Sequence, residues 1–363
     1  MKVPYLNLTV KDNDLKSELL HAADRVLSHG RLMLGPEVEE LEHRVAEYCG
    51  VKYAVGVSSG TASLYLALRA LDVGPGDEVI TTCFSYIATA NSIFLTGAKP
   101  VFIDINEDFN IDPGKIEKAV SKRTKVIMPV HFTGKICNIS EIIAIAQKHN
   151  LFIVEDASQA FGAEYNGKKS GSFGKVSCFS MNPMKILAAT GEAGMVVTHD
   201  KSIYETLKTL RYNGLINKTE CSYKSYNAKI DTIQAAMLLV KLKYLQNVID
   251  SRRKIASFYN KELADMVITP KEEKDYLDIY YSYIFLCNNK DKLQLFLESN
   301  NIETKIQTPL IMPKQPAYKE TTNDIFVVAE NVVKKSLSIP FHENLTVEEM
   351  HYVIKKIKGF YNS

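Results

Sequence analysis

The sequence predicts an α/β fold in which helices cover both faces of a mainly parallel sheet. Short β-branched and apolar runs alternate with helical patterns from residue 53 to residue 154. Near-continuous apolar strands separated by helices are typical of a parallel sheet that is buried on both faces. Polar residues follow several of these runs directly, at the strand ends where such sheets bind ligands. The length of 363 residues is enough for two domains.

The expected elements follow one another along the first part of the chain. The strand at 53–57 is followed by Ser58-Ser59-Gly60 and by an apolar-periodic helix at 61–71. The pattern predicts further helices at 88–95 and 139–148, and further strands at 77–82, 99–104, 125–130 and 151–154. Together these elements form the sheet and part of its helical cover.

The last part of the chain is predicted to form a smaller α/β lobe. A proline-free helical stretch runs from 231 to about 261, and a strand at 280–286 and a helix at 291–299 follow it. Thr346-Val347-Glu348-Glu349 forms a capping box that opens the final helix. The chemical motifs stop before this part. We therefore expect a large domain at 1–245 and a small C-terminal domain at 246–363.

Composition argues against several classes of protein. The net charge of +2 is too small to indicate a nucleic-acid partner or an anionic membrane surface. No apolar run approaches the roughly 20 residues that a membrane helix needs. The six cysteines are scattered, without a Cys-x-x-Cys pair or metal-ligand spacing to the histidines. We expect reduced, mostly buried thiols, no metal and a cytoplasmic location.

Lys185 and Asp156 carry the strongest chemical signal. Lys185 lies among apolar neighbours in Ser180-Met181-Asn182-Pro183-Met184-Lys185, and Val154-Glu155-Asp156-Ala157-Ser158-Gln159 is typical of a buried strand that ends in a carboxylate. An enzyme that holds pyridoxal phosphate needs a lysine amine to bond the cofactor and an acid to keep its pyridine ring protonated. Alone, each residue has an ordinary interpretation, as a surface lysine or as a helix-capping aspartate. The pair predicts a pyridoxal phosphate site.

Ser59-Gly60-Thr61 fits a phosphate site at the start of the helix at 61–71. Glycine lets the backbone approach closely, and the helix N-terminus offers free N–H groups and the positive end of the helix dipole. A plain strand-to-helix turn with a Ser/Thr cap explains the same residues equally well. The sequence pattern leaves both interpretations open.

The chain resembles the DegT/DnrJ/EryC1/StrS family of sugar aminotransferases over almost its whole length. The resemblance rests on ordered blocks, among them residues 34–38, 59–64, 154–160, 180–185, 226–229, 234–236 and 337–340. It implies the aspartate aminotransferase fold (fold type I), with a seven-stranded sheet in the large domain and a smaller C-terminal domain. It also implies pyridoxal 5′-phosphate as the cofactor.

The resemblance assigns a role to each candidate residue. Lys185 would bond the cofactor and then act as acid and base, and Asp156 would pair with the pyridine nitrogen. Gln159 would form a hydrogen bond with the ring hydroxyl, and Tyr86 would stack on the ring. The phosphate would be held by Ser59, Gly60, Thr61 and Ser180, and by Asn227 of a neighbouring subunit. We therefore expect a homodimer with shared active sites. Structural alternatives are a core aromatic for Tyr86, a strand-end serine for Ser180 and a turn residue for Asn227.

The sequence departs from the family pattern near the expected substrate. Lys229 stands where the family usually carries arginine, and lysine cannot make the same planar bidentate contact. Gln307-Thr308-Pro309 replaces His-Tyr-Pro, and Met181-Asn182 replaces the usual His or aromatic residue. The cofactor set is intact, so these differences bear on the substrate.

The resemblance implies an enzyme that transfers an amino group from an amino acid to a keto sugar, with glutamate as the expected donor. The expected acceptor is a nucleotide-activated deoxy keto sugar for lipopolysaccharide or another surface polysaccharide. Two alternatives stay open: a keto or aldehydo sugar acid without a nucleotide, and a non-catalytic regulatory protein on the same fold. Family members that act as 3-dehydratases carry histidine in place of the lysine, so Lys185 argues against dehydration.

Overall fold

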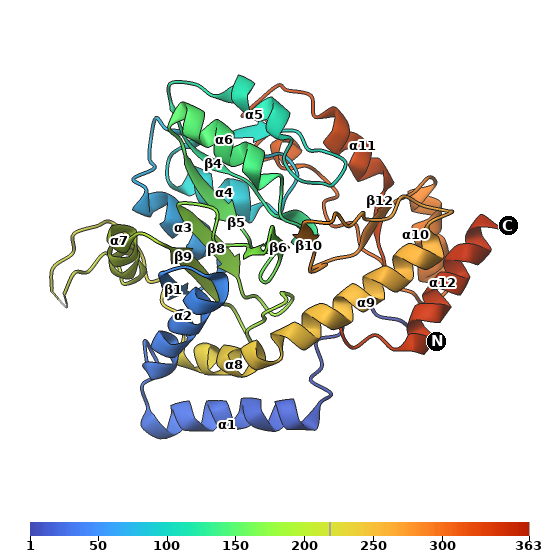
Figure 1. Ribbon diagram of the computed structural model, residues 1–363, viewed down its shortest axis with the longest axis horizontal. Helices are drawn as coiled ribbons and strands as arrows, with labels where there is room; N and C mark the ends of the chain where they lie inside the picture. The colour runs from blue at the N-terminus through green and yellow to red at the C-terminus, as the bar shows by residue number, and fades with distance from the viewer. Residues whose placement is uncertain (218, 363) are drawn as a thin grey trace.

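The computed structural model describes residues 1–217 and 219–362 (Figure 1). Its strands are β1 (Tyr53–Val57), β2 (Glu78–Thr82), β3 (Lys99–Ile103), β4 (Thr124–Met128), β5 (Phe152–Asp156), β6 (Glu164–Tyr165), β7 (Lys168–Lys169), β8 (Val176–Ser180), β9 (Gly194–Thr198), β10 (Tyr276–Leu277), β11 (Ile284–Leu286) and β12 (Ser336–Ser338). Its α-helices are α1 (Asn13–His29), α2 (Pro36–Cys49), α3 (Gly60–Ala70), α4 (Ala88–Leu95), α5 (Pro113–Ala119), α6 (Ile139–His149), α7 (Lys201–Arg211), α8 (Thr232–Lys243), α9 (Leu245–Leu263), α10 (Lys290–Ser299), α11 (Val327–Lys335) and α12 (Val347–Tyr361). Short 3-10 helices lie at Phe132–Gly134 and Met312–Lys314.

A seven-stranded sheet forms the centre of the large domain, in the order β1-β9-β8-β5-β4-β2-β3. β9 is antiparallel to both of its neighbours, and the other strands run parallel to one another, which confirms the mainly parallel sheet. The sequence pattern did not single out β8 and β9. Their register pairs Ser180 with Gly194, so the loop that carries Lys185 leaves and rejoins the sheet at one edge.

Helices cover both faces of this sheet, as expected (Figure 1). One buried apolar cluster joins α2, α6 and α8 to the sheet, and a second joins α3, α4 and α7 to it. Ile127 of β4 belongs to the first cluster and Val126 to the second. Because successive strand residues point to opposite faces, the two clusters lie on opposite sides of the sheet.

The helix expected from 231 to about 261 is two helices, which corrects that prediction. α8 ends at Lys243 and α9 begins at Leu245, with Tyr244 at φ −98° and ψ 0° between them. α8 packs against α1 and α2 of the large domain, whereas α9 packs against α12. The two halves therefore serve different cores. We propose a domain boundary at residue 245 on this basis.

The C-terminal domain has its own apolar core, built from α9, α10, α12 and the β11–β12 pair. The start of the chain belongs to this core, because Val3 is fully buried in it and its amide donates to the Asn301 carbonyl at 2.9 Å. Both termini therefore lie on this domain (Figure 1). The predicted capping box at Thr346 and Glu349 is confirmed. The strand expected at 280–286 is shortened to β11, and Tyr280 at its expected start takes a left-handed backbone conformation with φ 51°.

The cysteines are free thiols, five of them buried and Cys221 exposed. Within the described ranges, no helix combines the length and apolar character that crossing a membrane requires.

Candidate active site

A cavity of about 330 Å³ lies at the carboxyl ends of the parallel strands. Its lining contains eight of the nine predicted site residues: Ser59, Gly60, Thr61, Tyr86, Asp156, Gln159, Ser180 and Lys185. They lie at or after the ends of β1, β2, β5 and β8. Because these strands are parallel, segments far apart in the sequence meet at this edge.

Asp156 ends β5, and only 3% of its surface is exposed. One carboxylate oxygen accepts a hydrogen bond from the Thr89 hydroxyl at 2.8 Å, and the other accepts from the Ser158 amide at 3.2 Å. The Thr89 hydroxyl also lies 3.0 Å from that of Ser85. These contacts hold the carboxylate in one orientation inside the cavity.

Glu155, beside Asp156 on β5, points to the other face of the sheet and is fully buried. Its carboxylate lies 2.9 Å from His131 Nε2 and accepts from the Ser177 hydroxyl at 2.6 Å. Burial acts to raise the pKa of Glu155, but these hydrogen bonds and those from backbone amides of residues 171–174 outweigh burial and lower it. This network anchors the strand end that presents Asp156.

Gln159 connects the cavity to the small domain. Its side-chain oxygen accepts a hydrogen bond from the Thr133 amide at 2.9 Å, so its NH2 group is the part that can donate to a ligand. Thr133 itself has φ 60°, an uncommon conformation for a β-branched residue. The Thr133 carbonyl accepts from the Tyr281 amide at 2.8 Å, and Tyr281 also lines the cavity.

The first turn of α3 forms a cradle against the end of β8. Ser59 is the N-cap, and its hydroxyl accepts from the Ala62 amide at 3.1 Å. The amides of Gly60 and Thr61 belong to this first turn and have no hydrogen-bond partner within the helix. A Cβ on Gly60 would lie 2.5 Å from the Ser180 Cβ, so only glycine lets the helix start approach Ser180 this closely. The cradle fits a phosphate group.

Lys185 lies in the loop between β8 and β9. Its Nζ lies 4.4 Å from the centre of the Tyr281 ring, and its side chain is half-buried. The loop is held to the sheet edge because the Ala189 amide donates to the Met181 carbonyl at 2.8 Å. A lysine amine and the Asp156 carboxylate thus line one cavity.

Tyr86 and Asn227 lie differently from the other candidates. The Tyr86 side chain is 72% exposed although the residue lines the cavity, so the core-aromatic interpretation is wrong. Asn227 is exposed, lies outside the cavity lining and forms an isolated bridge with Tyr212. Its role toward a neighbouring subunit stays a prediction.

Of the residues that differ from the family pattern, Gln307 and Asn182 lie in the cavity lining and Lys229 does not. Gln307 lines the cavity and donates to the Tyr5 hydroxyl. Asn182 lines it too and donates to Glu192 at 2.6 Å. Lys229 lies outside the lining, with its Nζ 4.2 Å from the centre of the Tyr212 ring.

Thr89, Tyr281 and Lys305 are among the lining residues that sequence reasoning missed. Thr89 lies in the first turn of α4, where a hydroxyl has no distinctive sequence signal. Tyr281 and Lys305 belong to the small domain and reach the cavity only through domain packing. No local pattern could have found them.

The sheet order, the helical layers and the cavity at the strand ends define the class of this protein as a pyridoxal-phosphate-dependent enzyme of fold type I. The family described as the DegT/DnrJ/EryC1/StrS aminotransferase family matches residues 13–358, and the chain belongs to it. It is therefore an aminotransferase that uses pyridoxal phosphate.

Three similar proteins illustrate this membership. A "pleiotropic regulatory protein" of Geobacillus stearothermophilus is 40% identical, with 99% of each chain covered. The "dTDP-3-amino-3,6-dideoxy-alpha-D-galactopyranose transaminase" of Aneurinibacillus thermoaerophilus is 37% identical, also with 99% of each chain covered. The solved structure of S. venezuelae DesV has a TM-score of 0.96 at 35% identity and covers 100% of this chain and 99% of its own.

Proposed function

We propose that this enzyme transfers an amino group from glutamate to a keto sugar that is linked to a nucleotide, for the synthesis of a surface glycan. The observation that carries the proposal is the joint placement of Lys185, Asp156 and the α3 cradle around one cavity. The relative from Aneurinibacillus thermoaerophilus, whose name specifies a dTDP-linked amino sugar, supports the nucleotide-linked acceptor.

The residues present fit pyridoxal phosphate. Gly60, Thr61, Ser59 and Ser180 would hold its phosphate, and Asp156 would face its pyridine nitrogen. The NH2 group of Gln159 would donate to its ring hydroxyl, and the Tyr86 ring would cover one face. When bound, the cofactor supplies an electron sink for the amino-group carbon.

Lys185 has the acid/base role in this proposal. Its amine would bond the cofactor in the resting enzyme, and after displacement by the donor it would move the proton at the donor α-carbon. The Tyr281 ring lies under Nζ and limits the directions in which the amine can move. Lys305, a further ammonium group of the cavity lining, is suited to hold a donor carboxylate.

We also propose a homodimer in which Asn227 of each subunit contacts the cofactor phosphate of the other. The position of Asn227 on the surface, outside its own cavity, supports this assignment. The exposed Tyr86 ring at the cavity would be covered in such a dimer. We propose a cytoplasmic location, where the five buried free thiols stay reduced.

The test is to add pyridoxal phosphate to the purified protein, reduce it with borohydride and map the cofactor mass to a peptide. We expect an adduct on Lys185, and loss of that adduct when glutamate is added before reduction. Absence of an adduct would contradict the proposed catalytic role and would favour a regulatory role.

The acceptor is then tested by product mass with dTDP- and UDP-linked keto sugars, and with matched keto sugar acids that carry no nucleotide. An aminated product from the nucleotide-linked sugars alone supports the proposal. Amination of the free sugar acids alone would contradict the nucleotide part and leave the aminotransferase activity intact.

A further inference from the structure

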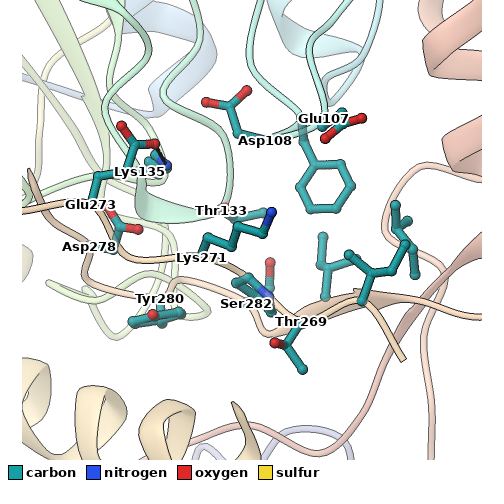
Figure 2. A pocket seen from close by; sticks show the side chains of 15 residues that line it. Glu107, Asp108, Thr133, Lys135, Thr269, Lys271, Glu273, Asp278, Tyr280 and Ser282 are labelled. Carbon is teal, nitrogen blue, oxygen red and sulfur yellow. Dashed lines mark hydrogen bonds and ion pairs between the residues drawn. The ribbon is translucent and has the colours of Figure 1, made fainter. Parts of the chain in front are cut away.

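A second cavity, of about 230 Å³, lies between the two domains (Figure 2). The large domain contributes residues 107–109, Thr133 and Lys135, and the small domain contributes lining residues from 268–273 and 278–286. This volume lies below the roughly 300–1,000 Å³ of pockets for drug-sized ligands. Any organic ligand of this cavity is therefore small.

Two buried polar side chains of this cavity have no partner. Asp278 is 5% exposed and Ser282 is 4% exposed. Asp278 Oδ1 and Ser282 Oγ have no hydrogen-bond partner among the residues that the structure describes. Leaving such a group unpaired is unfavourable, so both atoms favour a ligand that can satisfy them.

The groups around Asp278 leave its carboxyl without a dedicated cation. Lys135 is paired with Glu273 at 2.6 Å, as Figure 2 shows at one end of the cavity. Arg253 donates to the backbone carbonyl of Asp278 at 2.7 Å and pairs with Glu272 at 3.3 Å.

Burial raises the pKa of Asp278 to about 7, against the opposing effects of Lys135 and Arg253, while Glu272 and Asp108 add to the rise. An added cation at this position would relieve the cost of the ionised form.

An apolar wall makes up another part of the lining. Phe109, Ile268, Ile284 and Leu286 form this part, and Ile268 is 62% exposed at the surface. Glu107 and Lys271, both exposed, and the half-buried Asp108 also line the cavity. With the Lys135–Glu273 pair neutral, these charges leave an excess of acid around the cavity. The cavity therefore combines a buried carboxyl, a hydroxyl and a compact apolar wall.

We propose that this interdomain cavity is a second ligand site, which takes a small amino alcohol with a compact apolar frame. The protonated amine of the ligand would donate to Asp278, and its hydroxyl would exchange a hydrogen bond with Ser282. The carbon frame would pack on Ile284 and Leu286. Water alone could satisfy the two polar atoms, but it would leave the apolar wall without a partner.

The site shares a wall with the candidate active site. Thr133 lines the interdomain cavity and donates its amide to Gln159 in the active-site cavity. Tyr281, whose ring lies under Lys185, stands between Tyr280 and Ser282 of the second cavity. A ligand in the second cavity would therefore contact residues that are hydrogen-bonded or adjacent in sequence to residues of the active-site cavity.

The test is calorimetric titration of the full-length protein loaded with pyridoxal phosphate, with trans-4-aminocyclohexanol as the probe. Cyclohexylamine lacks the hydroxyl and cyclohexanol lacks the amine, so the three compounds separate the contributions. In wild type we expect binding of the amino alcohol, weaker binding of the amine and none of the alcohol. Affinity should rise about tenfold from pH 6 to pH 8 as Asp278 ionises.

Asp278→Asn should lower the affinity at pH 8 at least about tenfold and remove its pH dependence, and Ser282→Ala should lower it by a smaller factor. Circular dichroism and cofactor absorbance verify that each variant is folded and loaded. Equal binding of cyclohexanol, or unchanged affinity in a folded Asp278→Asn variant, would overturn the proposal. If that variant does not fold, a pH-independent affinity in wild type overturns it.

Discussion

The end of β5 and the interdomain cavity each bury a carboxyl group, but only the one at β5 is surrounded by hydrogen-bond donors. Glu155 accepts hydrogen bonds from Ser177 and three backbone amides and contacts His131. Asp278 Oδ1 has no partner in the described part of the chain. Burial acts to raise both pKa values; hydrogen bonds reverse this in Glu155, whereas the pKa of Asp278 rises to about 7.

The difference teaches that burial alone does not decide the charge of an acid; the donors around it do. Around β5 the donors are built into the protein, so the strand end is rigid and presents Asp156 to the cofactor site. In the interdomain cavity no donor contacts Asp278 Oδ1 among the described residues, so a ligand can supply the missing hydrogen bond.

The largest expected effect lies on the active-site side. Lys185→Ala should reduce the transamination rate by roughly 10⁴-fold or more, because it removes both the cofactor bond and the acid/base group. The rate is measured with glutamate and an accepted keto sugar. Lys168→Ala, at an exposed lysine of β7, is the matched control and should stay within about twofold of wild type. A Lys185→Ala variant with substantial activity would contradict the assignment of catalysis to the cavity beside the end of β5.

The second effect concerns stability. Glu155→Gln should lower the free energy of unfolding at pH 7 by about 3–5 kcal/mol, because it breaks a buried, fully hydrogen-bonded charge network. Urea denaturation of the holoenzyme measures the loss, and Glu107→Gln, at an exposed glutamate, is the control.

The pH dependence has a defined sign. The pKa of Glu155 is lowered on folding, so its contribution is present above the unfolded value of about 4.3 and is lost as the pH falls through the folded value. The gap between wild type and Glu155→Gln should therefore narrow in acid. A gap that is equal at pH 7 and in acid would contradict this account.

The smallest effect has the opposite sign. The pKa of Asp278 is raised on folding from 3.8 to about 7, so the carboxyl lowers stability progressively as the pH rises between these values. The full cost is on the order of 4 kcal/mol at 1.36 kcal/mol per pKa unit. Asp278→Asn should recover about 2 kcal/mol at pH 8, because the new amide also lacks partners.

Urea denaturation at pH 5 and pH 8 measures this recovery, with no added amine. The variant should gain more at pH 8 than at pH 5. A variant less stable than wild type at pH 8 would show that Asp278 has a stabilising partner and would remove the contrast with Glu155.

Much of this protein follows from local sequence patterns. The apolar strand runs, the Ser59 cap and the Thr346 capping box are set by neighbouring residues, so the sequence predicts them. Lys185 and Asp156 were also predictable, because the chemistry of pyridoxal phosphate requires a lysine and an acid near strand ends. Their meeting in one cavity follows from the parallel order of the strands.

Other features depend on contacts between distant segments. The break at Tyr244 arises between two cores, and Tyr281 and Lys305 reach the active-site cavity only because the domains pack together. The unpartnered state of Asp278 is likewise a property of the packed interface, since no neighbour in sequence determines what donors surround it. The sequence by itself determined the sheet elements and the cofactor residues, because these rest on short-range periodicity and residue chemistry. Only the tertiary structure decided the helix break, the small-domain contribution and the second cavity, because hydrogen-bond satisfaction and burial are set by residues far apart in the chain.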